Sequence, residues 1–149
     1  MNTKTFLIDD DSLSNYLTQN LLRVEGFSSA ISTFESAEAA LKKLLGQSLA
    51  EVPRVVFLDL NMPVMNGWQF LDALTPFKNK LKGRCHIFVL TSSLAMADME
   101  KAKTYDLVAG LIHKPIDSKE IHAIQSRLQL EDATLGSNSS LDSNSESRH

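Results

Sequence analysis

The chain has 149 residues, of which 43% are hydrophobic and 22% are charged, and its formal net charge is −3. This length and composition are typical of one soluble globular domain, and they exclude two full domains, a disordered chain and a membrane-embedded chain. Because the chain carries no excess of positive charge, neither nucleic acid nor an anionic membrane surface is an expected partner.

Short apolar runs predict four buried β-strands. They cover Phe6 to Ile8, Val55 to Leu58, Ile87 to Leu90 and Gly110 to Ile112. Hydrophobic residues are nearly continuous within these runs, which is typical of strands in a parallel sheet that is covered on both faces. A fifth, weaker strand is predicted at Ser28 to Thr33, where β-forming residues surround two apolar ones.

Segments with helical spacing of apolar residues separate the strands. The five stripes are Leu13, Leu17, Leu21 and Val24; Ala37, Ala40, Leu41, Leu44 and Leu45; Phe70, Leu71 and Leu74; Met96, Met99 and Ala102; and Ile121, Ile124 and Leu128. We expect such stripes to face the core, and we interpret the methionines as core filler rather than as cofactor ligands. Asp117, followed three residues later by Glu120, predicts the start of the last helix.

Alternation of strands and helices implies successive βα units. Right-handed crossovers then favour an α/β fold with an open parallel sheet and helices on both faces. Ligands of such sheets bind at the carboxyl ends of the strands, near the topological switch point. The residues that follow the strands are therefore the candidate functional residues.

The composition changes near residue 132. Residues 132–149 contain six serines and two asparagines but only two large apolar side chains. This segment can bury too little surface to offset the entropy of ordering. We predict a folded domain over residues 1–131 and a disordered tail over residues 132–149.

The single cysteine and the N-terminus indicate the compartment. Cys85 cannot form an internal disulfide and begins an apolar run, so we expect a buried thiol. Residues 1–5 precede only three apolar residues, which is too few for a signal peptide or a membrane span. We expect a cytoplasmic protein.

Three consecutive acids, Asp9, Asp10 and Asp11, follow the first strand. Carboxylates crowded in a crevice repel one another unless a cation or hydrogen bonds offset the repulsion. A simpler alternative is that Asp11 or Ser12 caps the next helix while the other acids are solvated.

Asp59 ends the third apolar run in the same way. At a switch point it would meet Asp9 and Asp10. Hard oxygen ligands of this kind suit magnesium or manganese, and magnesium often bridges carboxylates to a phosphoryl group.

Polar groups also follow the last two strands, where Thr91 and Lys114 lie. A hydroxyl can donate a hydrogen bond to a phosphoryl oxygen, and a lysine can neutralise its charge. Alone, Thr91 could start a helix and Lys114 could be a solvated charge. One polar group at each of four strand ends favours a phosphoryl site.

Four motifs together resemble the receiver domain of two-component response regulators, over roughly Lys4 to Leu130. They are FLIDDD (Phe6 to Asp11), LDLNMPVMNG (Leu58 to Gly67), LTS (Leu90 to Ser92) and HKPI (His113 to Ile116). The resemblance implies a doubly wound, flavodoxin-like sheet of five strands in the order 2-1-3-4-5.

The resemblance also implies roles for the acids. Asp59 would be the phosphoacceptor, phosphorylated by a sensor histidine kinase or a histidine phosphotransfer protein. Asp10 and Asp59 would bind magnesium directly, together with the backbone carbonyl of Asn61, and Asp9 would act mainly through water.

By the same resemblance, Thr91 and Lys114 would contact the transferred phosphoryl group, and the bond from Lys114 to Pro115 would be cis. One departure is Leu111, because family members commonly carry an aromatic residue three positions before the lysine. This change puts in doubt the route from Thr91 to the output surface.

The implied protein is a phosphoacceptor switch rather than an enzyme, with only autocatalytic phosphorylation and dephosphorylation. We expect a stand-alone receiver that signals through a downstream effector protein, because the tail is too short for a DNA-binding domain. The resemblance also implies an output surface, which in the family meets partner proteins or forms a homodimer. Here this surface would be built from Met96 to Tyr105, the strand Gly110 to Ile112, and Asp117 to Leu130.

Two alternatives stay open. In an enzyme of the haloacid dehalogenase type, the first strand would supply the nucleophile, but no further acidic pair follows Lys114 at a strand end and Asp59 would have no role. In the other, a receiver fold works without phosphorylation. A flavodoxin is excluded, because three aspartates would repel the phosphate of a flavin.

Overall fold

A computed structural model of the chain describes residues 4–144, with side chains as far as residue 133. In chain order its elements are β1 (Lys4–Ile8), α1 (Ser12–Val24), β2 (Ala30–Phe34), α2 (Ala37–Leu45), β3 (Val55–Asp59), α3 (Gly67–Leu74), η1 (Thr75–Phe77), α4 (Lys78–Leu81), β4 (His86–Thr91), α5 (Met96–Ala102), β5 (Val108–His113) and α6 (Ser118–Asn144). The chain divides into two compact units, Met1–Ile116 and Asp117–His149.

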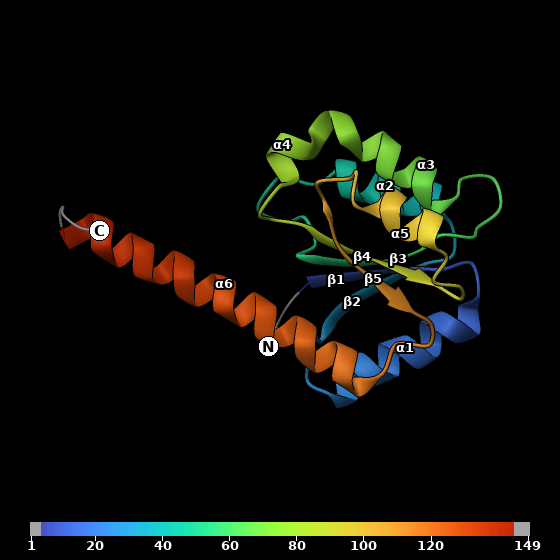
Figure 1. The fold of residues 1–149 in the computed structure, drawn as a ribbon, viewed down its shortest axis with the longest axis horizontal. Helices are drawn as coiled ribbons and strands as arrows, with labels where there is room; N and C mark the ends of the chain where they lie inside the picture. The colour runs from blue at the N-terminus through green and yellow to red at the C-terminus, as the bar shows by residue number, and fades with distance from the viewer. Residues whose placement is uncertain (1–3, 145–149) are drawn as a thin grey trace. The chain divides into compact units, whose positions relative to one another are not determined.

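The first unit is built on a parallel sheet with the strand order β2-β1-β3-β4-β5. Figure 1 shows α1 on one face of the sheet and α2, α3 and α5 on the other. All five predicted strands, the parallel sheet, its order and the helices on both faces are confirmed. The short η1 and α4 were not predicted.

The core explains why the apolar runs form strands. The central strand β3 is buried at all five positions, between β1 and β4. Alternate side chains point to opposite faces. On one face Phe6 and Val56 join the cluster that includes Phe70 and Leu74 of α3. On the other, the ring of Phe57 lies 6.1 Å from that of Phe27.

Helix α1 forms where it was predicted, but the prediction of which of its faces is buried is wrong. Leu13 and Leu17 are 61% and 58% exposed, and Val24 is exposed as well. The buried residues of α1 are Leu22 and Asn15. A polar residue thus occupies the core face, and apolar periodicity cannot identify such a face.

The predicted core role of the methionines is also wrong. Met96 is 71% exposed and Met99 is exposed as well, whereas Ala102 is buried. Helix α5 has only seven residues, and Ala102 at its C-terminal end is the one that is buried. Other stripes are confirmed, because their principal members are buried: Ala37, Ala40, Leu44, Phe70, Leu71, Leu74, Ile121, Ile124 and Leu128.

The second unit begins with the predicted cap. The backbone N–H of Glu120 donates to a carboxylate oxygen of Asp117 over 2.9 Å. Helix α6 then continues to Asn144, so the backbone of residues 132–144 is helical where the composition predicts a disordered tail. Residues 145–149 of that tail lie outside the described residues, and the boundary between domain and tail stays a prediction.

Two smaller features complete the description. Cys85 is buried immediately before β4, and burial raises the pKa of its thiol to about 12, which confirms a core thiol. Within residues 4–144, no helix combines the length and the apolar character that a membrane crossing requires.

Candidate functional site

The parallel register brings the predicted residues to one edge of the sheet. Ile8 of β1 pairs with Leu58 of β3, so Asp9 and Asp59, which follow these two residues, emerge side by side. Thr91 ends β4, and Lys114 directly follows β5. These four residues come from four different strands, and all of them lie in the first unit.

Three carboxylates form a cluster there. Asp9, Asp10 and Asp59 each place one carboxylate oxygen within 4.8 Å of the others. Asp9 and Asp59 are buried, and Asp10 is exposed. Hard oxygen donors at this separation fit a divalent cation such as magnesium, which would keep several of its waters at the open side. The cluster therefore could hold a metal ion.

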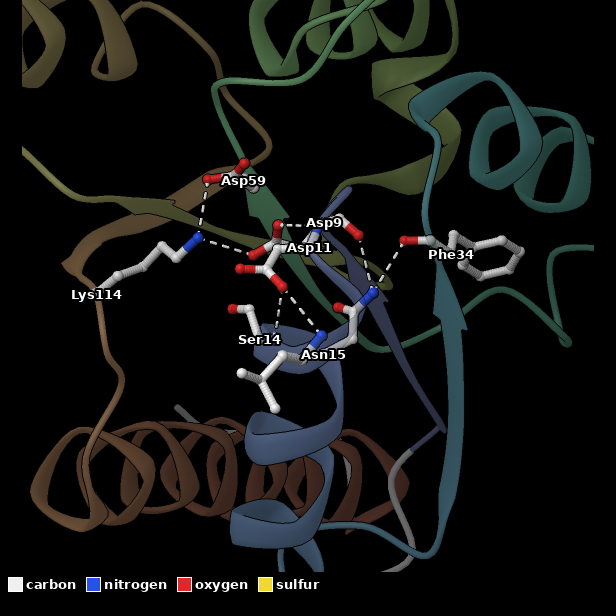
Figure 2. A network of polar contacts seen from close by, with 8 residues as sticks. Asp9, Asp11, Ser14, Asn15, Phe34, Asp59 and Lys114 are labelled. Atoms are coloured by element: carbon white, nitrogen blue, oxygen red, sulfur yellow. Dashed lines mark hydrogen bonds and ion pairs between the residues drawn. The ribbon is translucent and has the colours of Figure 1, made fainter.

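Lys114 is the one cation that the structure places against this cluster within the described residues. Its Nζ lies 2.8 Å from Oδ2 of Asp9 and 3.4 Å from Oδ1 of Asp59; Figure 2 shows the side chain directed at both. Burial alone would lower the pKa of Lys114, but the hydrogen bond to Asp9 and the charges of Asp59 and Asp9 raise it overall. The lysine is therefore charged at neutral pH.

The backbone also fixes Lys114. Its N–H donates to the carbonyl of Thr91 over 2.8 Å. The peptide bond between Lys114 and Pro115 is cis, as predicted.

Asp59 is an unusual carboxylate. Burial, followed by the charge of Asp9, raises its pKa to about 6, although Lys114 acts in the opposite direction. Burial of the carboxylate and the charge of Asp9 thus together outweigh the opposing effect of Lys114. A further cation in the cluster would compensate for the rest.

Asp11 does not join the cluster. Its Oδ1 accepts hydrogen bonds from the backbone N–H groups of Leu13 and Ser14, at 3.0 and 3.3 Å, so Asp11 caps α1. Its own N–H donates to Oδ1 of Asp9 over 3.0 Å. The capping alternative is confirmed for Asp11, and the cap also holds the carboxylate of Asp9 in place.

Thr91 is buried at the end of β4, and its hydroxyl is engaged locally. It donates to the carbonyl of Ser93 over 2.8 Å and accepts from the N–H of Ser93 over 3.1 Å. Contact with a phosphoryl group would require it to leave that carbonyl. Asn61 is exposed, two residues beyond Asp59, and the metal-binding role of its carbonyl stays a prediction.

Two residues that support the site were not among the site residues predicted from the sequence. Asn15 of α1 donates from Nδ2 to the carbonyls of Asp9 and Phe34. Gly67 begins α3 against the end of β3, where an added Cβ would lie 2.8 Å from the carbonyl oxygen of Asp59. Glycine in a motif signals a close approach, but a buried asparagine carries no such signal in one sequence.

Comparison with known proteins decides the family. A model described as the response regulator receiver domain matches residues 5–125. The chain belongs to this family. Receiver domains are phosphoacceptor switches of two-component systems rather than classical enzymes, and in general they interact with histidine kinases and effector proteins. Membership contradicts the dehalogenase alternative, in which Asp59 has no role, whereas the structure places Asp59 in a cluster with Asp9 and Asp10.

Solved structures agree with this assignment. A two-component response regulator from Cytophaga hutchinsonii is 26% identical with a TM-score of 0.77, and the match covers 87% of this chain and 98% of that one. A response regulator receiver protein from Dyadobacter fermentans is 26% identical with a TM-score of 0.74, and the match covers 83% and 95%. The chemotaxis protein CheY4 of Vibrio cholerae, at 22% identity and a TM-score of 0.69 over 85% and 98%, shares the fold. No curated protein sequence matches the chain.

The raised pKa of Asp59 predicts how the stability of the metal-free receiver depends on pH. Because the folded-state pKa of about 6 exceeds the ordinary value of 3.8, ionisation of Asp59 destabilises the fold as pH rises through about 6. With a chelator present, Asp59→Asn should become increasingly more stable than the wild type as pH rises from about 4 to 6. Below pH 4 the two proteins should differ little. Urea unfolding at a series of pH values measures this. Equal pH dependence of the two proteins would contradict it.

Gly67→Ala should disturb both the fold and the site. The new Cβ would also lie 2.9 Å from the Cα of Leu60, and backbone atoms cannot yield as a flexible side chain can. We expect the free energy of unfolding to fall by about 1–3 kcal/mol and phosphorylation to slow. The control is Gly46→Ala, where the nearest atom lies 3.2 Å away and the site is not involved. Equal behaviour of the two variants would show that the contact is unimportant.

Proposed function

We propose that this receiver accepts a phosphoryl group on Asp59 from the phosphohistidine of a sensor histidine kinase or a histidine phosphotransfer protein, in a reaction that requires magnesium. The supporting observation is the convergence of three carboxylates and one lysine: Asp59 lies beside Asp9, Asp10 and Lys114. Manganese prefers the same hard oxygen ligands and would substitute for magnesium.

Asp59 is the nucleophile in this proposal. One of its carboxylate oxygens attacks phosphorus, the phosphorus–nitrogen bond of the phosphohistidine breaks, and the imidazole nitrogen leaves with the bonding electrons. The product is an acyl phosphate. Attack of water on its phosphorus breaks the bond to Asp59 and releases inorganic phosphate, with the proton of the water passing to phosphate or solvent. This autocatalytic cycle is the only reaction assigned to the chain.

Such transfer depends mainly on positioning and on charge neutralisation. A bound magnesium ion would neutralise charge on the phosphoryl oxygens, and Asp9, Asp10, Asp59 and the carbonyl of Asn61 are the groups that would hold it. Lys114 supplies a second positive charge, whose Nζ is held 3.4 Å from the nucleophile by the bond to Asp9.

Thr91 supplies a hydrogen-bond donor. Its buried hydroxyl would turn from the carbonyl of Ser93 to an oxygen of the phosphoryl group. This movement would change the start of the segment that leads to α5, and it connects phosphorylation to a conformational change.

The conformational change would be read by an effector protein. Support comes from the exposed Met96 and Met99 on α5, within the region Met96 to Tyr105 that the family resemblance implies as part of an output surface. Flexible, polarisable methionine side chains suit a protein-binding surface. We place the reaction in the cytoplasm, and the homodimer stays a prediction.

Intact mass measurement with peptide mapping tests the phosphoacceptor. After incubation with acetyl phosphate and magnesium, we expect one phosphoryl group on the wild type, located on Asp59, and none on Asp59→Asn or after removal of magnesium. Asp9→Asn should still be phosphorylated on Asp59, because it retains the nucleophile. The reaction should be slow, because one of the carboxylates that would hold magnesium is lost.

The same measurement can refute the proposal. A phosphoryl group on Asp9 would indicate an enzyme that uses the first strand. If a folded wild-type protein takes up no phosphoryl group at any residue, from acetyl phosphate or from sensor kinases, the result would favour a module that works without phosphorylation.

Lys114→Met should slow phosphorylation by about 100-fold, because a positioned positive charge is lost at the reacting group. Magnesium should still bind, since the lysine no longer competes for the oxygens of Asp9 and Asp59. The control is Lys103→Met, at an exposed lysine that forms an ion pair with Glu100, three residues earlier in the chain. A wild-type rate in Lys114→Met would contradict the assigned role.

A further inference from the structure

Asn15 connects α1 to the ends of two strands. It is only 6% exposed, and its Nδ2 donates to the carbonyl of Asp9 over 2.9 Å and to the carbonyl of Phe34 over 3.3 Å. Figure 2 shows the amide between these two carbonyls, below the carboxylate cluster. The two hydrogens of one amide group therefore serve two backbone acceptors.

These carbonyls lie where the sheet ends. The N–H of Asp9 donates to the carbonyl of Phe34 over 3.0 Å, which extends the pairing of β1 with β2 by one residue. Beyond this bond the chain turns into α1, so the carbonyl of Asp9 has no strand partner. Buried backbone carbonyls are almost always paired, and Asn15 provides the partner here.

The hydrogen bond from Asn15 to the carbonyl of Asp9 determines where Asp10 lies. The carbonyl of Asp9 belongs to the planar peptide group whose nitrogen is that of Asp10, so fixing the carbonyl fixes the direction in which the chain continues. The carboxylate of Asp9 is also held by Lys114 and by the N–H of Asp11. The carboxylate of Asp10 is exposed and, within residues 4–133, makes no hydrogen bond or ion pair. Its place in the cluster depends on the backbone alone.

We propose that Asn15 is a positioning residue, which orients the peptide between Asp9 and Asp10 and thereby presents the carboxylate of Asp10 to the divalent cation. The inference rests on the proposed function, because it needs magnesium at the cluster. Asn15 itself touches neither the cation nor the phosphoryl group.

The test compares magnesium affinity in four proteins by isothermal titration calorimetry: the wild type, Asn15→Leu, Asn15→Ala and the control Asn20→Leu. Leucine resembles asparagine in size but has no hydrogen-bond donor. Asn20 lies on the same helix, about 140° around its axis from Asn15. We expect magnesium to bind about 10-fold more weakly in the Asn15 variants, as is typical when a residue that supports a metal ligand is lost. Asn20→Leu should bind it normally.

A double-mutant cycle separates positioning from general loss of structure. If Asn15 acts through Asp10, the double variant with Asp10→Asn should bind magnesium no more weakly than Asp10→Asn alone. At saturating magnesium, Asn15→Leu should accept phosphate from acetyl phosphate at close to the wild-type rate. Additive losses in the cycle, or unchanged magnesium affinity in Asn15→Leu, would overturn the inference.

Circular dichroism checks that the variants fold. If neither Asn15 variant folds, the inference is tested on the wild type by a magnesium titration followed by NMR. Magnesium should shift the side-chain amide signals of Asn15 together with the backbone amide signal of Asp10. Absence of these shifts would overturn the inference. The proposed function is judged separately. A wild type that binds no magnesium defeats both proposals, whereas a wild type that binds it and is phosphorylated on Asp59 leaves only the role of Asn15 at stake.

Discussion

Burial of Asp59 beside other carboxylates is the constraint on which the site depends. The register of β1 against β3 places Asp9 next to Asp59, and the following turn adds Asp10. Lys114 compensates only in part, since the pKa of Asp59 remains about 6. The metal-free receiver is therefore held in an electrostatically unfavourable state at neutral pH. That state favours binding of a divalent cation, and it disfavours any loss of the lysine.

Helix starts hold this unfavourable arrangement together. The first turn of α1 fixes the acids, because Asp11 caps the helix while Asn15 binds the carbonyl of Asp9. The first residue of α3, Gly67, packs against the backbone of Asp59 so closely that no side chain fits. Backbone contacts at these helix starts thus help to place Asp9 and Asp59, while the side chain of Lys114 also holds both carboxylates. We therefore expect movement at the site to affect these helix starts.

Contacts continue from α3 towards α5. Trp68 follows Gly67, its ring stacks on that of Tyr105 at 5.9 Å, and the Nζ of Lys101 lies 4.8 Å from the centre of its ring. The hydroxyl of Tyr105 donates to Asp72 of α3 over 2.7 Å. These contacts join α3, which packs against β3, to Lys101 of α5 and to Tyr105 beyond it. Trp68, Tyr105 and Leu111 all pack against the same hydrophobic cluster, so the effect of Leu111 on the coupling between β3 and α5 stays a prediction.

Much of the fold could be predicted from the sequence, because it rests on local, repetitive signals. Continuous apolar runs identify strands buried on both faces, and parallel strands bring their terminal residues to one edge. The buried face of α1 could not be predicted, because Asn15 is there to satisfy backbone carbonyls and not to bury apolar surface. The exposure of Met96 was missed for a related reason: periodicity shows which residues share a face, but not whether anything covers it.

The state of Thr91 explains why phosphorylation would act as a switch. Its hydroxyl now makes a neutral hydrogen bond to the carbonyl of Ser93, a bond that contributes about 0.5–1.5 kcal/mol. A bond to a charged phosphoryl oxygen is roughly twice as strong. In the proposed reaction the phosphoryl group would therefore draw the hydroxyl away from Ser93, and loss of the group would return it. Because the two bonds differ by only a small free energy, the exchange is reversible, as a signalling switch requires.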